Sequence, residues 1–131
     1  MRTIKFRGKS LYNNEWVYGN LFQGIDSNGN ICCFILPENR YVSVNAPDAF
    51  WMSFSSQDSY LVDINTVGQF TGITDRFGRE IYEGDKIVKI NIRNYVGTVL
   101  YENGEFVVAF DWYKSNLNEI RQETELEIIN N

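Results

Sequence analysis

Thr66–Val88, TVGQFTGITDRFGREIYEGDKIV, is the most strongly patterned part of the 131-residue chain. Its β-branched and aromatic residues form short runs separated by Gly and Asp, which is typical of strands joined by tight turns. We expect a strand over Val67–Thr74 and a type I turn with a G1 bulge over Asp75–Gly78, because Asp favours the first turn position and Gly the position that needs a positive φ. A short strand over Glu80–Tyr82, a second turn, and a strand over Lys86–Ile92 are expected to follow.

Six residues of this stretch are predicted to form a structural turn motif rather than a reactive site: Gly68, Gly72, Asp75, Gly78, Gly84 and Asp85. Gly84 can take a positive φ, and the Asp85 carboxylate can accept backbone N–H groups across the turn. Gly68 and Gly72 would allow tight strand curvature or the close approach of another strand.

The clearest hairpin after this stretch joins Val96–Glu102 to Glu105–Phe110 through Asn103–Gly104. An Asn-Gly pair is the strongest short signal for a two-residue hairpin loop. It places Tyr101 opposite Phe106 as an aromatic cross-strand pair.

The end of the chain, Leu117–Ile129, carries two competing patterns. Leu117, Ile120 and Thr124 have helical spacing, whereas the alternation of acidic and other residues from Glu123 has the spacing of a strand. We prefer a short turn followed by a strand from about Thr124.

The first half of the chain is also strand-like. Thr3–Arg7 is expected to be a strand with an apolar face, Ile4 and Phe6, and a basic face, Lys5 and Arg7.

A hairpin is predicted further on, where Leu21–Ile25 and Ile31–Leu36 flank Asn28–Gly29. If these two residues form the loop, Ile25 faces Cys32. Apolar residues on both sides of this hairpin indicate either burial or a contact in an oligomer.

Residues 37–60 are the least regular stretch and are expected to be a long loop between two lobes. The chain is thus predicted to be mainly β, with an N-terminal β region over 1–60 and a second region over 61–131. These regions are either separate domains or one continuous core.

Composition excludes several kinds of chemistry. The chain has no histidine, which excludes catalysis through a His base and zinc sites with His ligands. Its two cysteines, Cys32 and Cys33, are adjacent and are expected to be reduced strand residues, as in a reducing cytoplasm. No apolar run is long enough for a membrane helix, and no secretory signal is expected. With 12 basic and 17 acidic residues, the net charge is −5, which disfavours generic nucleic-acid binding by the whole molecule.

Several motifs resemble the YopX family of bacteriophage and prophage proteins. The long stretch Thr66–Val88 carries most of the resemblance, and IKFRG at Ile4–Gly8, EWVYG at Glu15–Gly19, GTVLY at Gly97–Tyr101 and LEII at Leu126–Ile129 are similar too. The resemblance implies a phage origin and a mainly β fold whose C-terminal part is a small SH3-like barrel. It implies no known activity.

Charged residues in the second half give two candidate sites, each with a plainer alternative. Asp75, Glu80, Glu83 and Asp85 could form a metal site or an acid/base site of a hydrolase, but their spacing favours turn and surface roles. The basic residues Arg76, Arg79, Lys86 and Lys89, with Arg93, could contact a nucleic-acid backbone while Tyr82 or Tyr95 stacks on bases, or could form a solvated face.

Aromatic residues are 15% of the chain, more than a small core easily buries. Phe50, Trp51 and Met52, and separately Trp112 and Tyr113, are therefore either core residues or a protein interface.

Together with the family resemblance, which implies the phage origin, these patterns favour a non-enzymatic phage accessory protein. We expect it to bind an unknown phage or host protein and to self-assemble as a homo-oligomer in the host cytoplasm. A nucleic-acid-binding protein of phage replication or packaging is the alternative. We expect no catalytic, metal or cofactor site and no membrane association.

Overall fold

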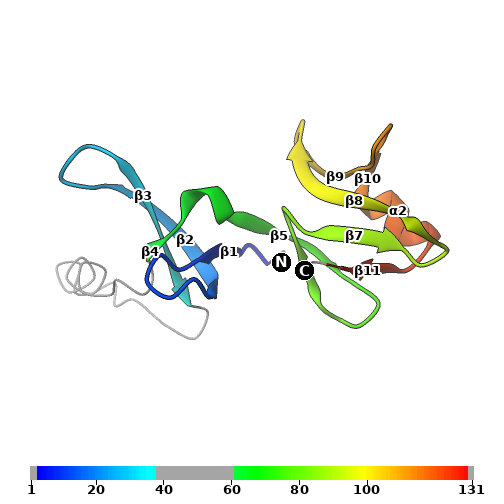
Figure 1. The fold of residues 1–131 in the computed structure, drawn as a ribbon, viewed down its shortest axis with the longest axis horizontal. Coiled ribbons are helices and arrows are strands. Elements are labelled where there is room, and N and C mark those ends of the chain that lie inside the picture. The colour runs from blue at the N-terminus through cyan, green and yellow to red at the C-terminus, as the bar shows by residue number, and fades with distance from the viewer. Residues whose placement is uncertain (1–2, 38–60, 130–131) are drawn as a thin grey trace. The chain divides into compact units, whose positions relative to one another are not determined.

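The computed structural model describes residues 3–37 and 61–129, which are mainly β (Figure 1). Contacts divide the chain into two compact units, Ile4–Gly68 and the residues from Gln69 onward. The strands, one 3₁₀ turn and one α-helix are β1 (Phe6–Lys9), β2 (Trp16–Ile25), β3 (Ile31–Pro37), β4 (Leu61–Val62), η2 (Ile64–Thr66), β5 (Gly68–Thr74), β6 (Glu80–Tyr82), β7 (Lys86–Lys89), β8 (Ile92–Glu102), β9 (Glu105–Ala109), β10 (Lys114–Asn116), α2 (Leu117–Glu123) and β11 (Leu126–Ile128).

The division after Gly68 differs from the boundary predicted after residue 60. β4 pairs with β3 through Cys33 and Val62, which places this short strand in the N-terminal unit. No helix among the described residues has the length and apolar character needed to cross a membrane.

In the N-terminal unit the strands lie in the order β4-β3-β2-β1, all antiparallel to their neighbours. The two outer strands of this set also meet at one end. The N–H of Asp63 donates to the carbonyl of Lys9 at 2.8 Å, and the N–H of Leu11 donates to the carbonyl of Leu61 at 2.9 Å. The sheet therefore curls around its core, which consists of Cys33, Ile35 and Val62 with Phe6, Val17, Leu21 and Val67 packed against them.

Two glycines of the N-terminal motifs are required by this curvature. A Cβ on Gly8 would lie 2.9 Å from Cγ2 of Val62 and 3.2 Å from Cδ1 of Ile35. A Cβ on Gly19, whose φ is +156°, would overlap the carbonyl oxygen of Leu36. Both positions need glycine because neighbouring strands approach too closely for a side chain.

The register predicted for the β2–β3 hairpin is wrong by one residue, since Ile25 pairs with Ile31 and not with Cys32. The loop is not a two-residue Asn-Gly turn but spans Asp26–Asn30. The Asp26 carboxylate accepts two backbone N–H groups of this loop at 2.9 Å, and Gly29 takes a φ of 82°. Because side chains alternate between faces, the slip places Cys33 and Ile35 on the same face as Leu21, toward the core.

The C-terminal unit holds a five-stranded antiparallel sheet in the order β10-β9-β8-β7-β11, together with the β5–β6 hairpin (Figure 1). The predicted register of the β8–β9 hairpin is confirmed, with Tyr101 opposite Phe106 and their ring centroids 5.0 Å apart. Asn103 and Gly104 both have positive φ, as a two-residue hairpin loop requires.

The core of this unit combines strands and helix: Ile81, Ile87, Val99, Val108, Phe110, Leu117, Ile120 and Leu126. Gly97 is needed under this core, because a Cβ there would overlap Val108 and lie 2.9 Å from Cε1 of Phe110.

The short turn expected before the last strand is an α-helix, α2. The Asn116 side chain accepts the backbone N–H of Glu119 at 3.0 Å and so caps the first turn. Leu117 and Ile120 are buried on one face, so the helical spacing reflects core packing. The strand predicted from about Thr124 begins at Leu126.

Candidate protein-interaction surface

The predicted turn after β5 forms, and we call Asp75–Arg79 the signature turn. The side chain of Asp75 is fully buried and is the centre of this turn. Its Oδ1 accepts the backbone N–H groups of Phe77 at 2.9 Å and of Arg79 at 3.0 Å. Its Oδ2 accepts the Nε–H of Arg79 at 2.9 Å and the backbone N–H of Ile128 at 3.1 Å.

These hydrogen bonds decide the protonation state of Asp75. Burial alone would raise the pKa of this carboxyl. Three backbone N–H donors and the Arg79 guanidinium outweigh burial and hold the pKa of Asp75 below its ordinary value of 3.8. The folded unit is therefore more stable with Asp75 ionised than with Asp75 protonated.

The signature turn also covers the outer edge of β11. The N–H of Arg76 donates to the carbonyl of Leu126 at 2.8 Å. The guanidinium of Arg79 donates to the carbonyl of Ile128 at 2.9 Å, and Asp75 accepts from the N–H of Ile128. β7 pairs with the other edge of β11, so the turn binds backbone groups that an exposed edge strand would offer to another chain.

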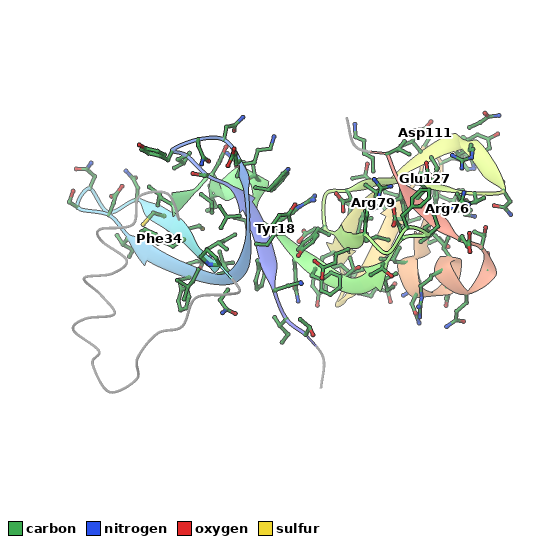
Figure 2. The ribbon with its side chains drawn as sticks, turned by 90° about the horizontal axis from the view of Figure 1, so that it is seen from below. Tyr18, Phe34, Arg76, Arg79, Asp111 and Glu127 are labelled. Carbon is green, nitrogen blue, oxygen red and sulfur yellow. The ribbon has the colours of Figure 1, made fainter. Side chains whose placement is uncertain are left out.

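The structure does not bring the four predicted nucleic-acid residues into one basic patch. The Arg76 guanidinium lies 3.8 Å from a carboxylate oxygen of Glu125 and 3.9 Å from one of Glu127. Arg79 is paired with Asp75. Arg76, Arg79 and Glu127 are labelled in Figure 2. Lys86 and Lys89 are three residues apart on one strand and so project from opposite faces of β7. Residues 69–131 carry seven basic and eleven acidic side chains, which gives this stretch a net charge of −4.

The predicted acidic residues are likewise dispersed. Asp85 is fully buried, and its Oδ2 accepts the backbone N–H of Tyr82 at 2.8 Å, while Gly84 has a φ of 95°. The Glu80 carboxylate accepts the hydroxyl of Tyr82 at 3.1 Å. Among the described residues, no three His, Cys, Asp or Glu side chains are grouped so that they could hold a metal ion.

The remaining glycines of the predicted turn motif differ in geometry. Gly78 has a φ of 79° at the G1 position of the signature turn, and Gly72 has a φ of 85° within β5. Gly68 is buried at the start of β5.

Trp112 and Tyr113 lie on the loop between β9 and β10, and both side chains reach solvent. Trp112 is 63% exposed and Tyr113 is 41% exposed. Tyr95 of β8 is 45% exposed and meets Trp112 edge to face, with ring centroids 4.9 Å apart. We call these three residues the aromatic surface. Phe50, Trp51 and Met52, the other predicted interface residues, lie outside the described residues.

Contacts with Phe110 and Lys89 hold the aromatic surface in place. The ring of Tyr113 stacks on the core residue Phe110 with centroids 5.0 Å apart, and the N–H of Phe110 donates to the carbonyl of Tyr113 at 2.8 Å. The ammonium group of Lys89 lies 5.6 Å from the ring centre of Phe110 and 3.4 Å from the Tyr113 hydroxyl. Since these contacts fix the loop, the exposed rings are a preformed surface.

The sequence predicts an interface role for Trp112 and Tyr113, and for Tyr95 only stacking on bases. The contact between Tyr95 and Trp112 is not visible in the sequence, because the two residues lie on β8 and on the β9–β10 loop and are brought together by the β8–β9 pairing.

Comparisons with known proteins agree with this fold. A family model described as "YopX protein" matches residues 5–131. The crystal structure of protein EF1440 from Enterococcus faecalis is similar, with a TM-score of 0.51 and 19% sequence identity over 100% of this chain and 94% of that one. A search of curated proteins found no match. Because the family model spans nearly the whole chain, the protein belongs to the YopX family.

Proposed function

We propose that this YopX-family protein is a non-enzymatic phage or prophage accessory protein that acts by binding another protein through its aromatic surface. The observation that carries the proposal is the edge-to-face contact of Tyr95 with Trp112, two rings that remain 45% and 63% exposed. Tyr and Trp are enriched at the centres of protein interfaces, where rigid rings bury large areas with little loss of conformational entropy.

The chemistry of the buried carboxylates favours binding over catalysis. Asp75 and Asp85 accept backbone N–H groups inside turns. A carboxylate used in this way holds the chain in place and is not presented to a substrate. The proposed location is the cytoplasm of the bacterial host.

We further propose that the C-terminal unit is a small SH3-like barrel. Its support is the five-stranded antiparallel order β10-β9-β8-β7-β11 combined with the strongly bent β5–β6 hairpin, whose register shifts between Phe70 and Thr74.

Self-association is the second part of the proposal. Ile25 and Ile31 lie directly opposite each other at the end of the β2–β3 hairpin and are 72% and 63% exposed. We propose that this exposed aliphatic pair forms a contact between copies of the chain. Sedimentation velocity should show oligomers of the wild type and mainly monomers of I25T/I31T, and a strictly monomeric wild type would remove this part.

The binding proposal is tested by affinity capture from host cells that carry the phage, with and without nuclease. W112A is the test variant, because Trp112 is mostly exposed and its loss should leave the core intact. Y12A is the matched control, since Tyr12 is 77% exposed in the other unit. A partner held by wild type and Y12A but lost by W112A would support the proposal, and equal recovery by all three would contradict it.

A further inference from the structure

One face of the β1–β2 pair places cations directly against aromatic rings. Arg7 pairs with Tyr18, and Lys9 pairs with Trp16. Because side chains alternate along a strand, these four residues share one face. The opposite face carries Phe6 and Val17, which pack on the core. We call Arg7, Lys9, Trp16 and Tyr18 the cation–aromatic face.

The cations of this face are held close to the indole ring. The guanidinium carbon of Arg7 is 4.3 Å from the ring centre of Trp16, and the ammonium nitrogen of Lys9 is 5.3 Å from it. Arg7 is only 8% exposed, so it orients the ring rather than meeting a ligand. Trp16 and Tyr18 remain 37% and 38% exposed and thus offer ring surface to solvent.

The strands of this unit carry only basic charges, because β1 to β4 contain Arg7 and Lys9 and no Asp or Glu. Two acids adjoin these strands: the Glu15 carboxylate accepts a hydrogen bond from the side chain of Asn13 at 3.4 Å, and the Asp63 carboxylate accepts the backbone N–H of Asn65 at 3.0 Å.

We propose that the cation–aromatic face binds single-stranded nucleic acid, with bases stacked on Trp16 and Tyr18 and a phosphate bound by Lys9. Exposed rings beside cations are the combination that such strands require. Residues two apart on a strand are separated by about 6.8 Å, about twice the 3.4 Å between stacked bases of a duplex. The two rings therefore suit the bases of an extended strand and not those of a double helix. This site lies in a different unit from the aromatic surface.

The test measures binding of the full-length protein to a fluorescein-labelled 12-nucleotide oligothymidine by fluorescence anisotropy. K9E and W16A should each weaken binding at least tenfold at low salt, and K9R and W16F should retain most of it. The matched controls are K86E, the same charge change on β7, and W112A, the same truncation on the aromatic surface. Both should stay within about twofold of wild type. Circular dichroism checks that each variant is folded.

Salt gives a second readout. The logarithm of the wild-type association constant should fall linearly with the logarithm of the salt concentration. K9E should make the slope of this line less negative by about 0.7, which is the contribution of one phosphate contact in a single strand. Absence of binding by wild type at low salt would overturn the proposal. So would tighter binding to a duplex of the same length, or equal losses in K9E and K86E. Because W112A is a control here and the test variant for protein binding, failure of one proposal leaves the other testable.

Discussion

The signature turn should stabilise the C-terminal unit far more than an ordinary turn, and D75A measures by how much. The Asp75 carboxylate accepts two backbone N–H groups within the turn, one from Ile128 of β11, and the Nε–H of Arg79. A hydrogen bond to a charged group contributes about 1.5–3 kcal/mol and a neutral one about 1 kcal/mol. The hydrogen bonds within the turn contribute less to stability, because water can replace the carboxylate as acceptor. The bond with Arg79 also contributes less, because that side chain is half-exposed and the charge is screened by solvent. We therefore expect D75A to lower the free energy of unfolding by about 3–5 kcal/mol.

The chain supplies a matched control in Asp26. Its carboxylate accepts the N–H groups of Asn28 and Asn30, just as Asp75 does for Phe77 and Arg79, but it is exposed and reaches no other strand. D26A should thus cost only about 0.5–1.5 kcal/mol.

Urea unfolding monitored by circular dichroism gives both values, and hydrogen exchange of the Ile128 amide locates the effect. D75A should speed exchange at Ile128, whereas D26A should leave it unchanged. If the two variants lose the same stability within about 0.5 kcal/mol, the contact with β11 contributes nothing and the reasoning is refuted.

Three further predictions concern Asp75 and two glycines of the C-terminal unit. Folding lowers the pKa of Asp75, so the stabilisation by its carboxylate is present above the unfolded pKa of about 3.8 and is lost as the pH falls through the folded pKa. The urea concentration at half-unfolding should therefore decrease when the pH is lowered below about 4. D75N should make this concentration depend less on pH. G97A should lower the free energy of unfolding by about 1–3 kcal/mol in thermal denaturation, because the added methyl group would overlap Val108. G24A, where the nearest atom is 3.7 Å away, should change it by less than about 1 kcal/mol, and an equal effect of both would contradict the packing argument. G84A should cost about 1–2 kcal/mol in the same assay because its φ is 95°, and a neutral result would show that the turn relaxes.

The two hairpins show when a turn sequence predicts register. Asn103 and Gly104 stand between strands with no competing turn residue, so the two-residue loop and its register follow from the sequence. Before Asn28 and Gly29 stands Asp26, whose carboxylate captures the following N–H groups and lengthens the loop. An aspartate thus begins both loops, although the sequence pattern predicts this role only for Asp75.

The contacts of Arg76 and Arg79 with β11 and the residue before it could not be predicted, because these partners are remote in sequence. The backbone carbonyl that Arg79 binds is 49 residues away, on β11. A linear pattern shows only that two arginines lie in a turn, which is also what a phosphate-binding loop would show. Only the β7–β11 pairing brings the acidic strand to this turn.

The helix α2 illustrates a similar limit. Both periods were visible in Leu117–Ile129, and the choice depended on which face meets a core. The buried positions Leu117 and Ile120 pack beside Val99 and Val108 of the sheet, so this segment is helical up to Glu123. The strand-like alternation that starts at Glu123 corresponds to β11, which begins at Leu126.

The central claim is that the protein works by binding a protein through the aromatic surface. The most direct measurement is nuclease-treated affinity capture from phage-carrying host cells with wild type and W112A side by side, read by quantitative mass spectrometry. We predict a partner that persists after nuclease treatment with wild type and falls at least tenfold with W112A. Recovery of no partner after nuclease treatment, or equal recovery of the partner by both proteins, would contradict the account.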